Sequence, residues 1–251
     1  MRLISAFLLI TAGFGPVLGQ TVSYSSRTVG RASFHAVVVD LRSENVKVSG
    51  LMTSELGRSQ SAIRMIEDAK PDVAVCGTFF CTESNLPVGG IVLEGIEMAK
   101  GARGTAFAID YMNHPRIFDT GYGQKIDPNA YRFMLRGGVR IVTAGKTTIY
   151  PTDQKFRLSS VGGKAPRTAV GLTKEGKMVI LVTTQNVYLR DTAAAMKSFG
   201  VQDAISFDGG SSTTLYYKGR MIVKPGRRLT NLLVVYEAPG AAWQTKPVVS
   251  K

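Results

Sequence analysis

The chain has 251 residues, of which 44% are hydrophobic and 20% are charged, and its formal net charge is +13. This composition is typical of a globular protein with a sizeable core, and the sequence contains no repeat or low-complexity tract. The positive charge favours an anionic partner such as a phosphorylated glycan, a lipid headgroup or a nucleic acid. Because no nucleic-acid-binding motif and no interleaving of basic and aromatic residues is present, we expect no nucleic-acid partner.

The first 19 residues have the layout of a secretory signal peptide. Arg2 precedes an apolar stretch over residues 3–14, and Val17-Leu18-Gly19 follows it. This stretch is too short to span a bilayer, and no later segment approaches the length of a membrane helix. We therefore expect a cleaved leader over residues 1–19, with an uncleaved anchor as the alternative, and one domain over residues 20–251. The mature protein is expected to be periplasmic or secreted, without an integral membrane segment.

Short apolar runs rich in β-branched residues predict strands through most of the chain. In chain order they cover residues 35–41, 45–48, 73–76, 91–93, 106–110, 136–142, 168–172, 178–183 and 232–236. Helical spacing of apolar residues occurs over residues 59–68. It recurs at Leu189, Ala193 and Met196, in a helix that Gly200 should end. This pattern predicts an α+β fold: a single domain with a mixed β-sheet of short strands and a few packed helices.

The two cysteines, Cys76 and Cys81, can form a disulfide if the protein is exported. Positions five apart on an extended strand lie beyond bonding reach, so a bridge requires residues 77–80 to fold into a turn. Two buried free thiols are the alternative. The sequence leaves both states open.

A turn rich in glycine and serine carries one carboxylate late in the chain. An apolar run over residues 204–207 leads into Asp208-Gly209-Gly210-Ser211-Ser212, and residues 215–217 lead away. Glycines let a backbone approach a ligand closely, and consecutive free N–H groups form a nest for anions. A carboxylate beside such a nest suits the hydrolysis of a phosphate-containing substrate. Asp-Gly between alternating apolar residues is, however, also a signal for a β-hairpin.

The small number of histidines sets several enzyme classes aside. His35 and His114 are too few for most metal centres, and the sequence has no HExxH, no Cys/His zinc spacing and no Walker loop. No serine lies in the G-x-S-x-G elbow of the α/β-hydrolases. Because no cluster of metal ligands is present, we expect neither a metal ion nor a cofactor, with a divalent ion near Asp208 as the alternative.

Four short segments occur in one order along the chain. They are CGTFF at residues 76–80, PVGG at 87–90, PRTAVG at 166–171 and DGGSS at 208–212. In this combination the chain resembles the phosphodiester glycosidase family over residues 36–236. The family usually has Asn where this chain has Cys76, and this departure bears on specificity or on catalysis.

The resemblance implies a glycosidase that acts on a sugar-1-phosphodiester, and the chemistry of the residues fits this reaction. Ordinary glycosidases need two carboxylates, one of them to protonate a poor leaving group. A sugar-1-phosphodiester instead releases a phosphate monoester, whose second pKa is about 6, so this group leaves as an anion with little protonation. An anion clamp and one carboxylate are then enough.

On this basis we predict that Asp208 is the base or nucleophile. We assign the phosphate clamp to Arg167, because its planar guanidinium matches phosphate oxygens. A second carboxylate, if one is needed, is Glu94 or Asp191, although Asp191 is placed to cap a helix. The residues predicted to bind the substrate are Thr78, Gly209, Gly210, Ser211 and Ser212.

Two other functions use the same features. The positive charge, and Cys76 in place of the usual Asn, are also compatible with a non-catalytic protein. Such a protein would bind anionic polysaccharide and assist exopolysaccharide assembly or export. A phosphodiesterase that cuts P–O instead of C–O would use nearly the same clamp. The sugar, the aglycone and the oligomeric state are left open by the sequence. The expected partner is a phosphorylated glycan or a sugar-1-phosphodiester substrate.

Overall fold

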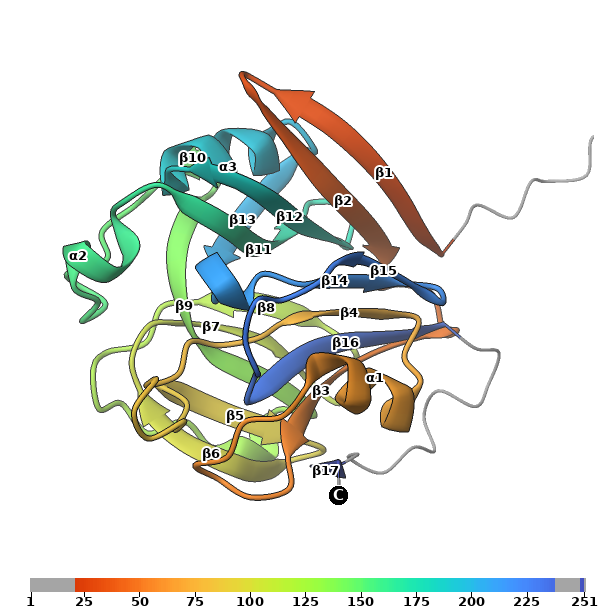
Figure 1. The fold of residues 1–251 in the computed structure, drawn as a ribbon, viewed down its shortest axis with the longest axis vertical. Coiled ribbons are helices and arrows are strands. Elements are labelled where there is room, and N and C mark those ends of the chain that lie inside the picture. Colours follow the sequence, from red (N-terminus) through yellow and green to blue (C-terminus); the bar gives the residue numbers. More distant parts are fainter. Residues whose placement is uncertain (1–20, 238–248, 251) are drawn as a thin grey trace, which may run out of the picture.

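About half of the described chain folds into strands, which form two β-sheets (Figure 1). The computed structural model describes residues 21–237 and 249–250, so the leader predicted over residues 1–19 lies outside the described residues. Within them, the larger sheet has eleven strands. They are β1 (Val22–Val29), β2 (Ala32–Asp40), β5 (Gly89–Leu93), β6 (Ile96–Ala102), β7 (Thr105–Ile109), β8 (Pro115–Phe118), β9 (Phe133–Thr143), β10 (Lys146–Thr147), β11 (Ala165–Thr173), β12 (Lys177–Val187) and β13 (Val201–Ser206).

The smaller sheet has six strands in the same part of the chain. Among the described strands every pairing is antiparallel, except that β17 runs parallel to β3. The prediction of a mixed sheet is therefore corrected to two sheets that are almost wholly antiparallel. The strands of the smaller sheet are β3 (Val46–Thr53), β4 (Val73–Cys76), β14 (Leu215–Tyr217), β15 (Arg220–Val223), β16 (Asn231–Glu237) and β17 (Val249–Ser250).

The fold has a larger share of strand than the α+β prediction implies. The missed strands are mostly edge strands with many side chains that face solvent: four consecutive residues of β1 are exposed, and β6 buries only one residue. Such strands lack the apolar pattern on which a prediction depends. The described helices are α1 (Ala62–Ala69), α2 (Leu158–Val161) and α3 (Leu189–Lys197), with short 3₁₀ turns η1 (Pro128–Ala130) and η2 (Gly210–Ser212).

The main core lies between the two sheets. Ile180 and Ile205 of the larger sheet belong to the same buried cluster as Val75 and Leu233 of the smaller one. All four side chains are completely buried. Burial of apolar surface is the main favourable term in folding, so these facing sheets hold the described residues together as one unit.

The two longer helices cover the outer faces of the sheets. Leu189, Ala193 and Met196 of α3 pack on the larger sheet, as their spacing predicts. Gly200 follows with a φ of +77°, a left-handed conformation that suits glycine after a helix. Met65 and Ile66 of α1 pack on the outer face of the smaller sheet. Both predicted helices are thus confirmed, although α1 starts three residues later than expected.

The long strand β9 joins the two halves of the larger sheet. Its end pairs with β13, and its start pairs with β5 and β7. The change of partner occurs at Gly137, whose φ of +113° is unusual for a residue with a side chain. Gly89 of the PVGG segment packs directly on the backbone here, and a Cβ at Gly89 would overlap the Arg136 carbonyl oxygen. Gly89 therefore allows two backbone segments to pack closely beside the loop that carries Thr78.

We expect Gly89→Ala to lower the free energy of unfolding by about 3 kcal/mol, because the added methyl group has no space. Gly163→Ala is the matched control, since a Cβ there meets nothing within 4 Å. Urea unfolding of both variants measures the difference. Equal stability of the two variants would show that this close backbone contact is absent.

Candidate active site

Three loops meet at one end of the smaller sheet. Strand β4 is antiparallel to both β14 and β16, so its last residue lies beside the starts of those two strands. The loop after β4, the loop before β14 and the loop before β16 therefore converge. They cover residues 77–88, 207–214 and 224–230.

The Asp208 turn connects the two sheets. Strand β13 before it belongs to the larger sheet, while β14 after it belongs to the smaller one. The hairpin alternative is therefore wrong, because β13 and β14 do not pair. The chain is held at this crossing by hydrogen bonds from Phe207 N to Thr168 O (3.0 Å) and from Asp208 N to Gly77 O (3.0 Å).

Asp208 lies at the bottom of this junction, and only 5% of its surface is exposed. Its Oδ2 atom accepts a hydrogen bond from Nη2 of Arg227 at 2.8 Å, and its Oδ1 accepts one from the Gly209 N–H at 2.9 Å. Burial raises the pKa of Asp208, whereas the Ser212 side chain, Arg227 and the Gly209 N–H each lower it. The carboxylate is thus desolvated but held by donors.

Arg227 brings the positive charge to Asp208. Its Nε donates to the Ser212 hydroxyl at 2.6 Å, and its guanidinium carbon lies 4.4 Å from the centre of the Phe80 ring. The stacked ring and the Ser212 contact fix the plane of the guanidinium. Because 28% of the Arg227 side chain is exposed, the ion pair opens to solvent on one side. No role for Arg227 is predicted from the sequence.

The residues after Asp208 form the short turn η2. Gly210 has a φ of +58°, and a Cβ there would meet nothing within 4 Å. Ser211 is exposed at the rim, whereas Ser212 is buried next to Arg227. Gly209 packs against the chain, since a Cβ would lie 2.6 Å from the Pro166 carbonyl oxygen. The turn is therefore open at Gly210 and Ser211, and the anion nest stays a prediction.

Arg167 is buried, and its guanidinium donates hydrogen bonds to backbone carbonyl groups of the protein. Its Nε donates to Val187 O at 3.3 Å, and its Nη2 donates to Val161 O at 3.0 Å and to Gly163 O. Burial lowers the pKa of Arg167. The clamp role of Arg167 stays a prediction, and the guanidinium that lies against Asp208 belongs to Arg227.

Thr78 lies in the first of the three loops, and the Asn231 side chain forms hydrogen bonds with both its backbone N–H and its carbonyl group. Asn231 Oδ1 accepts from Thr78 N at 2.8 Å, and Asn231 Nδ2 donates to Thr78 O at 3.3 Å. The Thr78 hydroxyl is buried and has no hydrogen-bond partner among the described residues. It faces the Cα atom of Gly137, where a Cβ would collide with it. Asn231 is thus a positioning residue that sequence analysis missed.

Cys76 and Cys81 are free thiols in the structure. The Cys76 Sγ atom lies 3.0 Å from the Thr168 hydroxyl and 3.1 Å from the Asp208 carbonyl oxygen. Burial raises the pKa of Cys76 to about 12. Cys76 therefore contacts the main chain behind the Asp208 carboxylate as a neutral thiol. Cys81 is exposed, so the expectation of two buried thiols holds for Cys76 only.

We expect one thiol to react with a disulfide reagent in the native protein and two after denaturation. Hydrogen bonds from Ser84 lower the pKa of the exposed Cys81, whereas Cys76 is buried and neutral. Titration with Ellman's reagent without prior reduction measures this. Two unreactive thiols in denaturant would instead show a disulfide.

The other carboxylates named from the sequence have structural partners. Glu94 forms an ion pair with the buried Lys47 at 3.0 Å. Asp191 Oδ2 accepts from the Tyr188 N–H at 2.9 Å and so caps α3. The described residues include no group of three or more His, Cys, Asp or Glu side chains that could hold a metal ion. They also include no helix long and apolar enough to cross a membrane.

Comparison with solved structures places this fold among known ones. The zebrafish N-acetylglucosamine-1-phosphodiester alpha-N-acetylglucosaminidase catalytic domain, auto-inhibited by its pro-peptide, aligns with a TM-score of 0.69 and 22% identity, over 89% of this chain and 85% of that one. A Synechocystis protein aligns with a TM-score of 0.66 and 12% identity, over 85% and 61% of the two chains. A Burkholderia pseudomallei protein aligns with a TM-score of 0.55 and 13% identity, over 82% and 74%. At these identities the alignments show a shared fold.

The sequence itself carries the family assignment. No curated protein matches the chain. The profile of the phosphodiester glycosidase family, however, matches residues 69–236, which include all three loops of the candidate site. The resemblance found in the sequence motifs is thereby confirmed: the chain belongs to the phosphodiester glycosidase family.

Proposed function

We propose that this protein hydrolyses the glycosidic bond of a sugar-1-phosphodiester in a glycan or glycoconjugate. The observation that carries the proposal is the buried Asp208 carboxylate paired with Arg227 at 2.8 Å, where three loops meet. Family membership supports the reaction class. Export to the periplasm or the medium, predicted from the leader, belongs to the same proposal.

The chemistry requires only one carboxylate and one anion clamp. Water attacks the anomeric carbon, the bond from that carbon to the phosphate oxygen breaks, and the electron pair leaves on the phosphate monoester. Because this leaving group has a second pKa of about 6, it departs without a strong acid. Asp208 acts either as the base that takes the proton from water or as the nucleophile that water later displaces.

Arg227 is our candidate for the phosphate clamp. Its partly exposed guanidinium has the geometry to bind phosphate oxygens while it remains in contact with Asp208. The open turn at Gly210 and the exposed Ser211 provide further donors on the same side. In this proposal Arg167 positions the start of β11 through the three carbonyl groups that it binds, and Thr78 contacts the substrate.

Cys76 stands where the family usually has Asn, and this difference leaves the Asp208–Arg227 ion pair in place. Its thiol contacts the Asp208 main-chain oxygen and Thr168, whereas the Asp208 carboxylate faces Arg227. The contacts at Asp208 therefore favour the enzyme over the non-catalytic polysaccharide binder. Replacement of the usual Asn changes what lies behind the carboxylate and not the ion pair itself.

Release of free sugar tests the proposal. The mature protein is incubated with UDP-N-acetylglucosamine and with a methyl phosphodiester of N-acetylglucosamine-1-phosphate, with and without a chelator, and products are separated by chromatography. We expect free sugar and a phosphate monoester or UDP. Release of sugar-1-phosphate would instead indicate a phosphodiesterase. Salt-sensitive binding of anionic polysaccharide without any product would indicate the binder.

A further inference from the structure

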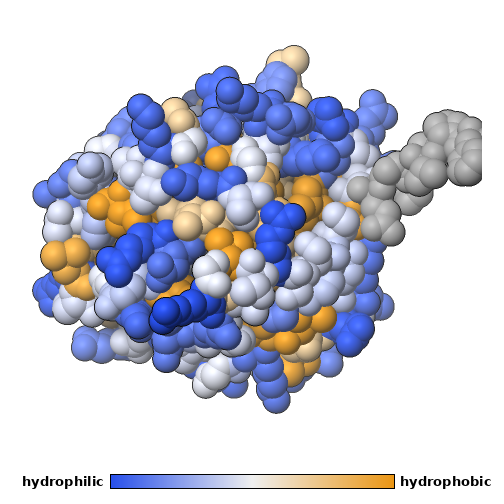
Figure 2. Space-filling model, turned by 90° about the horizontal axis from the view of Figure 1, so that it is seen from above, coloured by the Kyte–Doolittle hydropathy of each residue, from blue (hydrophilic) through white to orange (hydrophobic). Residues whose placement is uncertain are grey.

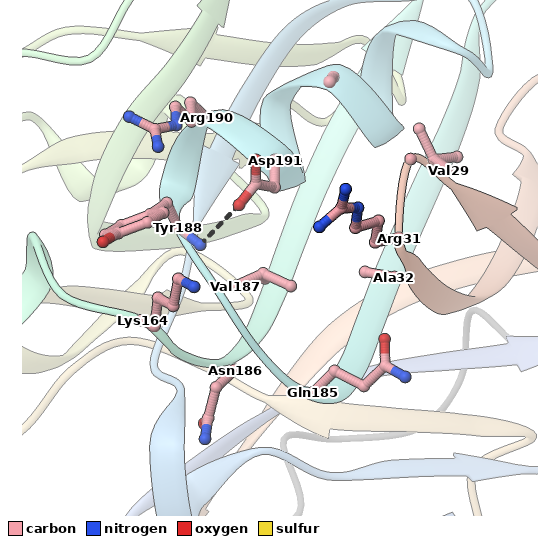
Figure 3. A pocket seen from close by; sticks show the side chains of 12 residues that line it. Val29, Arg31, Ala32, Lys164, Gln185, Asn186, Val187, Tyr188, Arg190 and Asp191 are labelled. Carbon is pink, nitrogen blue, oxygen red and sulfur yellow. Dashed lines mark hydrogen bonds between the residues drawn. The ribbon is translucent and has the colours of Figure 1, made fainter.

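A pocket lies outside the candidate active site. Its volume is about 540 Å³. It is formed by the turn between β1 and β2, the end of β12, the loop before β11 and the start of α3 (Figure 3). Pockets of about 300–1,000 Å³ are the usual size for small-molecule sites. The volume is therefore sufficient for a charged sugar unit.

Three cationic side chains from different elements line this pocket. Arg31 comes from the β1–β2 turn, Lys164 from the loop before β11 and Arg190 from the start of α3 (Figure 3). None of the three forms an ion pair with a carboxylate among the described residues. The one acid in the lining, Asp191, is occupied by the Tyr188 N–H at the start of α3. The pocket therefore carries excess positive charge.

Tyr188 holds two of these cations in place. Lys164 Nζ lies 5.4 Å from the centre of the Tyr188 ring, and the guanidinium carbon of Arg190 lies 4.5 Å from it. Such cation–π contacts order long side chains that otherwise move freely in solvent. The two contacts therefore hold Lys164 and Arg190 beside one aromatic ring in the pocket lining.

Arg167 connects this pocket to the candidate active site. Its guanidinium donates to the carbonyl of Val187, a pocket residue, and to Gly163, next to Lys164. Its Cα atom lies 3.7 Å from the position that a Cβ of Gly209 would take. The buried Arg167 and the first residues of β11 therefore lie between the two sites.

The surrounding surface favours a hydrated, charged ligand. The end of the molecule formed by the β1–β2 hairpin and α3 lies at the top of Figure 1 and faces the viewer in Figure 2. This face is mainly hydrophilic, with hydrophobic residues in small separate areas (Figure 2). A lipid surface or an apolar partner would need a larger continuous hydrophobic area.

We propose that this pocket binds a second anionic group, a phosphate or a carboxylate, on the same glycan that is cleaved at Asp208. The inference rests on the proposed function and specifies its substrate class as a glycan with repeated negative charges. Arg31, Lys164 and Arg190 bind the second charge, one or more sugar units away from the phosphodiester at Arg227. The pocket therefore selects longer anionic chains over single phosphodiesters.

Binding to the full-length Asp208→Asn protein tests this without any turnover. The probes are oligomers of N-acetylglucosamine with one or four 1-phosphodiester links, measured by calorimetry at about 50 mM salt. The pocket variant is Arg31→Gln/Lys164→Gln/Arg190→Gln in the Asp208→Asn background. The control variant removes the same charge from three exposed cations elsewhere, as Arg116→Gln/Lys174→Gln/Arg220→Gln. Circular dichroism confirms that all variants are folded.

We expect the pocket variant to bind the four-link oligomer about tenfold more weakly, since exposed charge pairs each contribute a small factor. Binding of the one-link probe should stay within about twofold, because its single phosphodiester is bound at Arg227 and the Asp208 turn and not in the pocket. A four-residue uronic acid oligomer distinguishes the anions: its binding depends on the pocket if the second group is a carboxylate. Equal weakening of the four-link oligomer in the pocket and control variants would overturn the inference. Absence of sugar release by the wild type would instead count against the proposed function alone.

Discussion

Replacement of Asp208 by asparagine is expected to reduce kcat for sugar release by a factor of about 10²–10⁴, the usual contribution of a positioned acid or base. Asparagine is close in shape and can still accept from the Gly209 N–H, so the turn should keep its form. The amide, however, neither takes a proton from water nor forms a covalent bond with the sugar. Steady-state kinetics on a sugar-1-phosphodiester measures the loss.

Asp203→Asn is the matched control for this change. Asp203 is the third residue of β13, and its carboxylate pairs with Arg140 at 2.5 Å instead of facing the site. The control should retain kcat within about twofold even if it unfolds more easily. A folded Asp208→Asn protein with more than half of the wild-type activity would exclude Asp208 as the catalytic group.

Replacement of Arg227 by glutamine is expected to have the second largest effect, a loss of about 10²–10³ in kcat/KM. The guanidinium is the cation that the structure places against Asp208, and it is partly open to a phosphate. Arg227→Lys should recover part of the activity, because lysine keeps the charge but lacks the planar fork. Arg228→Gln is the control, since Arg228 donates to the Ser59 carbonyl instead.

The pH profile of Arg227→Gln should change in a defined direction. Burial raises the pKa of Asp208, and Arg227 opposes that shift. Without Arg227, Asp208 retains its proton to a higher pH. Because the ionised carboxylate is the active form, the acid limb of the kcat/KM profile should move to higher pH. An unchanged acid limb, or a shift to lower pH, would show that Asp208 is not the group that titrates there.

The parts of the fold that were predicted are those with strong local patterns. The run at residues 73–76 coincides with β4, and the apolar face of α3 lies where its spacing predicts. Edge strands such as β1 and β6 were missed because solvent covers much of their surface. Local patterns also do not show that β13 and β14 lie in different sheets, since that depends on long-range pairing.

The candidate site was predicted in part for the same reason. Asp208 and its glycine turn form one continuous segment, so the sequence of that segment alone predicts their chemistry. Arg227 comes from another loop, and its contact with Asp208 exists only after the sheet has formed. Arg167 occupies a family motif, but the motif does not reveal that its side chain is directed to three carbonyl groups. The partners of long side chains are set by tertiary packing.

Hydrolysis in ¹⁸O-labelled water tests the central claim most directly. Oxygen atoms of a phosphate monoester do not exchange with water under assay conditions, so mass spectrometry of that product identifies the bond that was cut. If the carbon–oxygen bond at the anomeric centre breaks, as proposed, the phosphate product carries no ¹⁸O and the label enters the sugar. Incorporation of ¹⁸O into the phosphate product would show P–O cleavage and contradict the assignment of this protein as a glycosidase.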